Sequence, residues 1–320
     1  DRCIPDLPED PTGPGDFSQE TDVVKIESTN NKYNLYDTFW SARSGTYIEA
    51  DLPGILNTEF FIDDVGPTQG EYEYVQTLNL AKNGVFGFNP YNDNDFEYNL
   101  KIEGSDPVYA YSLIFLQPVQ FDPDYDAVEL AGTVLTIQED AYTITGVEFN
   151  AQGGVEAITL VQGDKDIWLS QDNPYNIGDH TITVIAVNNE ATSCGVEVDG
   201  IVQWVDLYKT NSIGGLSVTL LGIVVTDSTS IINCNIMVGN SEIVLQNNRK
   251  VLRDGVEVEG SEVNIHSTSS YPYSLEAIYV HFTPDEDDFI SVGETFKDPV
   301  FGQFGILFDS INNGFDDSES

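Results

Sequence analysis

Short segments in which apolar and polar residues alternate recur along most of this chain, and they constrain the fold more than any other feature. A period of two places every second side chain on one face of a β-strand. Residues 71–75 and 109–115 are clear examples, and turn residues such as Asn83 and Gly84 separate neighbouring segments. The segments follow one another about every 8–12 residues, as in sandwiches and barrels, and no window has a helical period. We therefore predict an all-β fold of two or more β-sandwich-like domains with very little helix.

The charge of the chain restricts its partners. It has 54 acidic and 12 basic residues, for a net charge of −42, yet 40% of the residues are hydrophobic and 11% aromatic. That apolar content is typical of a folded body rather than a disordered acidic segment. Nucleic acid is excluded as a partner because phosphate binding needs clustered Lys and Arg. We expect the acidic surface to be stabilised by salt, which screens repulsion, or by divalent cations.

Composition and turn signals divide the chain into four segments. No stretch approaches the ~18 apolar residues of a membrane span, so membrane insertion is not expected. The chain begins with Asp1 rather than Met, which favours a mature secreted form. The predicted segments are a Pro-rich extended arm (1–20), an N-terminal β domain (21–126), a β domain with a duplicated hairpin (127–250), and C-terminal strands that complete the N-terminal domain and end in a frayed acidic tail (251–320).

A repeat within the third segment carries two of the three cysteines. Residues 177–184 recur as residues 213–220, and each copy leads into a segment that contains Cys194 or Cys234. Equivalent positions in a duplicated unit favour a disulfide between neighbouring strands, which would stabilise the fold by about 3–4 kcal/mol. The alternative is a pair of buried free thiols. Cys3 is left as a free thiol or as a cross-link to another subunit.

Clusters of carboxylates are the strongest candidates for a ligand-binding site, and the aromatic residues leave a sugar-binding platform open. Asp122, Asp124 and Asp126 stand at alternate positions, and oxygens spaced in this way in a loop can surround Ca²⁺. Weaker candidates are Asp285, Asp287 and Asp288, and Asp93 with Asp95. Ca²⁺ is thus the candidate cofactor, and plain solvated charge is the alternative for each cluster.

No residue pattern indicates catalysis. The sequence contains no nucleophile elbow, zincin motif, phosphate-binding loop or dinucleotide fingerprint. The three histidines, at 180, 266 and 281, lie in strand-like sequence, where a structural role is favoured. The aromatic residues at 72, 74, 109, 111 and 115 are expected mainly in the core. We therefore predict that the chain is not an enzyme.

Several segments carry a resemblance to a known class of protein. They are residues 131–137, 142–144, 157–163 and 292–302, together with the paired I-G-x-x-[ST]-[IV]-T units. They resemble the β-rich domains of archaeal surface-layer proteins, especially those of small symbiotic archaea. The resemblance covers about half of the chain. It implies an extracellular lattice protein built of β-sandwich domains, acidic and cation-dependent.

These observations predict an extracellular structural protein that self-assembles into a cell-surface array. The main partner is the chain itself, as a homopolymer or lattice, and cell-surface glycans are a further candidate. An edge strand can be covered by a strand from a neighbouring subunit, so the candidate assembly residues are Cys3, Val23, Val24 and Ile26. The absence of any N-x-[ST] sequon leaves a filament or adhesin subunit open. An alternative of another class is a secreted carbohydrate-binding module or hydrolase.

Overall fold

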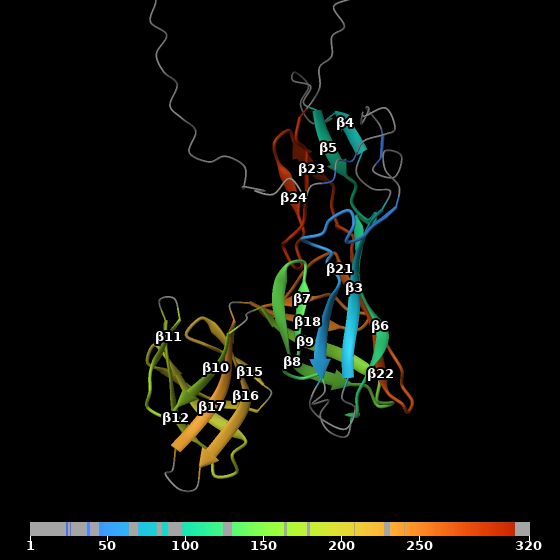
Figure 1. The fold of residues 1–320 in the computed structure, drawn as a ribbon. Coiled ribbons are helices and arrows are strands. Elements are labelled where there is room, and N and C mark those ends of the chain that lie inside the picture. Colours follow the sequence, from blue (N-terminus) through green and yellow to red (C-terminus); the bar gives the residue numbers. More distant parts are fainter. Residues whose placement is uncertain are drawn as a thin grey trace, which may run out of the picture.

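The chain is built of β-strands throughout the part that its computed structural model describes. That part comprises residues 24, 26, 37–38, 45–63, 70–81, 85–88, 98–123, 130–162, 165–177, 180–207, 209–226, 231–239 and 241–310. All regular elements in it are strands, arranged in antiparallel sheets (Figure 1). The predicted all-β, sandwich-like fold is therefore confirmed. The same residues include no helix with the length and hydropathy of a membrane span.

Two six-stranded sheets pack face to face and form what we call the first sandwich. One sheet contains β1 (Thr46–Tyr47), β2 (Glu59–Asp63), β3 (Gly70–Leu80), β6 (Tyr109–Gln120), β21 (Ser261–Ser267) and β22 (Ser274–Phe282). The other contains β7 (Val134–Ile137), β8 (Asp140–Phe149), β9 (Val155–Gln162), β18 (Ser241–Gln246), β19 (Leu252–Arg253) and β20 (Val256–Glu257).

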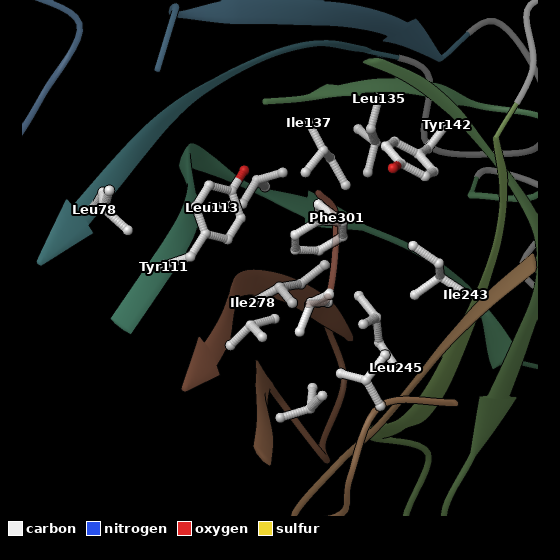
Figure 2. Packing of buried hydrophobic residues seen from close by; sticks show 14 of the residues in the cluster. Leu78, Tyr111, Leu113, Leu135, Ile137, Tyr142, Ile243, Leu245, Ile278 and Phe301 are labelled. Carbon is white, nitrogen blue, oxygen red and sulfur yellow. The ribbon is translucent and has the colours of Figure 1, made fainter. Parts of the chain in front are cut away.

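The core of the first sandwich follows directly from strand alternation. Along β3 the even-numbered side chains from Tyr72 to Leu80 are buried, whereas Glu71, Glu73 and Asn79 are exposed. Figure 2 shows Phe301 between side chains of both sheets, among them Tyr111 and Tyr142. Each large apolar side chain buried in this way contributes about 1.5–3 kcal/mol. The aromatic residues that the alternation assigned to the core are all buried.

Strands from the C-terminal part complete sheets begun by the N-terminal part. β22 pairs with β6 in the first sandwich, and β23 (Asp288–Ser291) pairs with β5 (Tyr98–Ile102), which also pairs with β4 (Val85–Phe88). β24 (Thr295–Lys297) and β25 (Gly305–Leu307) form a separate hairpin. In Figure 1 the strands β4, β5, β23 and β24 lie at the upper end of the molecule.

A second sandwich is inserted between β9 and β18 and has its own core (Figure 1, yellow-green and orange). One sheet contains β10 (Lys165–Ser170), β15 (Thr210–Ile213), β16 (Leu216–Thr226) and β17 (Ile231–Gly239). The other contains β11 (Tyr175–Ile177), β12 (His180–Val187), β13 (Ser193–Val198) and β14 (Ile201–Asp206).

The chain crosses between the two sandwiches twice, at adjacent points. It leaves through β9 into β10 and returns through β17 into β18. Gln162 pairs with Ser241 on one side of the crossing, and Lys165 pairs with Val238 on the other. A Cβ on Gly239 would collide with the Val161 side chain and a backbone carbonyl, so only glycine fits in the returning strand. The described strand ends on both sides of the crossing are thus antiparallel pairs, and they are closely packed at Gly239.

The two cores divide the chain differently from the predicted segments. The segment predicted as one domain, 127–250, contributes β7, β8, β9 and β18 to the first sandwich, and only 165–239 forms the separate body. The reason is that a period of two identifies a strand and its buried face but not the sheet it joins. The predicted arm, residues 1–20, lies outside the described residues.

Candidate functional site

The second sandwich is a duplication of a four-strand unit. β10–β13 form the first repeat and β14–β17 the second, and the first strand of each repeat pairs with the last strand of the other. Val184 pairs with Val196 and Leu220 with Ile236, and a register shift follows at the same place in both copies. The sequence predicted a duplicated hairpin. The structure extends the unit to four strands, and the two sheets have the same strand order when the repeats are exchanged.

The duplication also makes Trp168 and Trp204 equivalent, which the sequence reasoning missed. Trp168 pairs with Asn235 on β17, and Trp204 pairs with Gly195 on β13, next to the cysteine in each case. The signal was present in the sequence, since the interval between the two tryptophans equals the interval between Ile177 and Ile213.

Cys194 and Cys234 form the predicted disulfide, with their Cα atoms 6.8 Å apart. Both are fully buried in the core of the second sandwich. The expected location on neighbouring strands is wrong, because Cys194 lies on β13 in one sheet and Cys234 on β17 in the other. β13 and β17 are equivalent strands of the two repeats, so the disulfide joins equivalent positions of the two sheets.

One outer surface of the second sandwich exposes Trp168, which is 54% accessible. Its indole crosses β17 and comes within 3.5 Å of the position that a Cβ on Gly222 would occupy. Ser170 donates a hydrogen bond of 2.7 Å to Asn233 on the neighbouring strand. We call this surface the Trp168 face. Its members are Trp168, Ser170, Gly222, Val224, Asn233 and Asn235.

The opposite outer surface exposes Trp204, which is 52% accessible. Its indole covers Gly195, at 3.7 Å from the position of an added Cβ. We call this surface the Trp204 face. Its members are Val202, Trp204, Asp206, Ser193, Gly195 and Glu197. The two faces point away from each other because they are the outer sides of facing sheets. They differ in charge, since Glu197 and Asp206 lie on the Trp204 face and the described side chains of the Trp168 face are all uncharged.

The predicted cation cluster at 285–288 is not assembled. Asp287 accepts a hydrogen bond from the backbone N–H of Gly104 at 2.9 Å and pairs with Lys101 at 2.9 Å. The hydrogen bond from Lys101 and then that from Gly104 hold the pKa of Asp287 below its usual value. Asp288 accepts the adjacent N–H of Phe289. This loop is therefore docked on the turn that follows β5.

The remaining cation candidates are mostly undescribed. Asp122 is described and partly buried, whereas Asp124, Asp126, Asp93 and Asp95 lie outside the described residues. Within the described part, no three or more His, Cys, Asp or Glu side chains are placed to share a metal ion.

Two lysines each bridge a pair of carboxylates on this acidic surface. Lys101 contacts Glu103 and Asp287, and Lys250 contacts Glu257 and Glu259. The hydrogen bond that Lys101 donates to Asp287 is the main cause that raises the pKa of Lys101, and the one that Lys250 donates to Glu259 is the main cause that raises the pKa of Lys250. Exposed pairs of this kind add little to stability because water and salt screen them, so they relieve repulsion locally rather than form a site.

The carboxylate of Asp298 is buried, and hydrogen bonds within a turn occupy both of its oxygens. It accepts hydrogen bonds from the backbone N–H groups of Val300, Phe301 and Gly302 and from the hydroxyl of Tyr109. Burial and then the nearby Asp298 charge raise the pKa of Tyr109 well above its usual value. The carboxylate fixes the turn that inserts Phe301 into the first core, and this role is structural.

The described residues of the predicted assembly set and the histidines His180 and His266 make contacts within the chain. Val24 and Ile26, the described members of the predicted assembly set, are partly buried and pack on the first core, while Cys3 and Val23 lie outside the described residues. His180 pairs with Asp199 at 2.6 Å, and the ring of His266 contacts that of Tyr279.

The chain matches no protein-family model and no curated protein.

Proposed function

We propose that this chain is an extracellular structural protein that self-assembles into a cell-surface array, like the surface-layer proteins it resembles. The observation that supports this most is the disulfide-linked second sandwich, whose two outer faces expose tryptophan on a strongly acidic chain. Structural disulfides persist in oxidising, extracellular compartments. Exposed apolar surface on a chain of this charge is typical of an interaction site.

The connection between the sandwiches suits a subunit of an array. Two chain segments join the sandwiches, and a hydrogen bond of 3.1 Å between the hydroxyls of Thr210 and Thr145 links them as well. A neighbour attached to the second sandwich would therefore be held to the first through two chain segments rather than one flexible linker. Salt or divalent cations would lower the repulsion between assembled copies.

Electron microscopy with light scattering tests this proposal. The full chain is compared in low salt with chelator, in 1 M NaCl, and with millimolar Ca²⁺. We expect monomers in the first buffer and ordered sheets in the others. Filaments would favour the filament or adhesin alternative. A protein that stays monomeric in all three buffers would contradict self-assembly.

A carbohydrate-binding module is the second candidate. Trp168 is half exposed and pairs with Asn235, and Asn233 lies two positions away on the same face of β17. An aromatic face next to hydrogen-bonding groups can stack on a sugar ring. Titration with neutral oligosaccharides, followed by tryptophan fluorescence, tests this candidate directly.

A further inference from the structure

We propose that the Trp168 face and the Trp204 face are two docking surfaces for further copies of this chain, each pairing with the same face of a neighbour. This inference rests on the proposed self-assembly and names the surfaces that carry it. It follows from the duplication, the charge distribution and the geometry of the second sandwich.

The duplication provides an internal comparison. The paired strand positions that kept the same residue in both repeats are Trp168 and Trp204, Ile177 and Ile213, Thr183 and Thr219, Cys194 and Cys234, and Val198 and Val238. Among these pairs only the tryptophans are more than half exposed in both copies. A tryptophan over a glycine protects the sheet locally, yet that role leaves half of each indole in water. Tryptophan is also enriched at the energetic centres of protein interfaces.

Charge identifies a second copy as the occupant. Every copy carries a net charge of −42, and like charges brought together across an interface cost several kcal/mol. Two copies can therefore approach most closely where carboxylates are absent. The described side chains of the Trp168 face meet this condition, since Trp168, Ser170, Val224, Asn233 and Asn235 are all uncharged. Toward the first sandwich the same side of the sheet is covered, because Thr219 and Met237 are buried and Thr210 bonds to Thr145. Asp166 holds the position on β10 opposite Met237.

The two faces differ in their expected dependence on salt. Glu197 and Asp206 flank Trp204, so the approach of two Trp204 faces needs their charges screened or bridged by cations. The described members of the Trp168 face carry no carboxylate. Contacts through this face should persist at lower salt than contacts through the Trp204 face.

The opposed directions of the faces make each copy bivalent. A single self-complementary face yields a closed dimer. Two such faces on opposite sides of one rigid sandwich let each copy bind two neighbours, so assembly continues beyond the dimer. The disulfide between the two sheets holds the two faces in a fixed relative orientation.

Sedimentation velocity of the full chain in 1 M NaCl tests the inference. We expect wild type to form species larger than dimers, Trp168→Ser and Trp204→Ser each to stop at dimers, and the double variant to be monomeric. Loss of such a tryptophan should weaken its contact by about 30-fold or more. Phe60→Ser is the matched control, because Phe60 is an aromatic residue of the first sandwich with 58% exposure, and it should behave as wild type.

Asn233→Asp gives a test that does not depend on removing a tryptophan. It is nearly isosteric, keeps an acceptor for Ser170, and adds one carboxylate to the Trp168 face. Association should weaken relative to wild type in ~0.1 M salt, where the Debye length is ~10 Å, and recover in 1 M salt, where it is ~3 Å. A purely structural defect would not recover with salt.

The outcomes separate this inference from the proposed function. If wild type assembles and the double tryptophan variant assembles equally, the two faces are not the contacts, although self-assembly stands. If wild type is monomeric with both NaCl and Ca²⁺, self-assembly itself fails. Quenching of tryptophan fluorescence by a neutral oligosaccharide, without any self-association, would overturn the inference in favour of sugar binding.

Discussion

Reduction of the Cys194–Cys234 disulfide should destabilise the second sandwich by about 4 kcal/mol. The bond joins residues separated by 40 positions, and the chain-entropy relation for a loop of that length gives ~4 kcal/mol at 25 °C. Reduction leaves every side chain in place, so no cavity contributes. The first sandwich lies outside the loop and should keep its stability, because its core shares no residue with the second.

Urea unfolding followed by tryptophan fluorescence measures this effect. Two of the three tryptophans lie in the second sandwich, and a Cys3→Ser, Trp40→Phe background removes the remaining thiol and the third indole. With a urea slope of about 1–2 kcal/mol/M, the reduced protein should unfold at a midpoint lower by about 2–4 M. Equal midpoints for the oxidised and reduced forms would refute the argument that the loop closure stabilises this sandwich.

Four further outcomes are expected. Asp298→Ala should destabilise the first sandwich by about 3 kcal/mol or more, because it leaves buried N–H donors unpaired, and Asp298→Asn should cost less. Equal losses of unfolding free energy for the two variants in urea would contradict this. The Tm should rise by several degrees between low salt and 1 M NaCl as the net charge of −42 is screened, and a flat calorimetric series would argue against strong repulsion. Gly239→Ala should cost about 1–3 kcal/mol in urea unfolding and Gly222→Ala much less, because only the former Cβ meets backbone; equal costs would exclude the tight crossing. Hydrogen bonds from the N–H of Thr181 and then from His180 hold the pKa of Asp199 below its usual value. The stability that the Asp199 carboxylate contributes is therefore present above the unfolded-state pKa of ~3.9 and is lost as the pH falls through the lower folded-state pKa. Asp199→Asn should reduce the fall in Tm below pH ~4, and an unchanged pH profile of Tm would exclude this contribution.

The local sequence pattern was sufficient to predict the strands, their buried faces and the pairing of the two cysteines. Alternation along β3 and β6 predicts which side chains enter the core, because a strand presents successive side chains to opposite sides whatever its partners are. The cysteine pairing followed from the repeat, since equivalent residues of two copies lie on equivalent strands. The predicted cation clusters had no comparable support, because carboxylates are frequent throughout an acidic chain and spacing alone does not make their oxygens converge.

The assignment of strands to sheets was decided by tertiary structure alone. β9 and β18 are far apart in sequence and pair in the first sandwich, while the residues between them form the second. The exchange of β10 and β14 between the repeats places the disulfide across two sheets and the tryptophans on opposite surfaces. Such pairings depend on which apolar faces can cover one another at long sequence separation, and a period of two is identical for every choice of partner. The sequence by itself therefore determined strands and their inner faces, whereas the sheets, the inserted sandwich and its two outer faces came from packing.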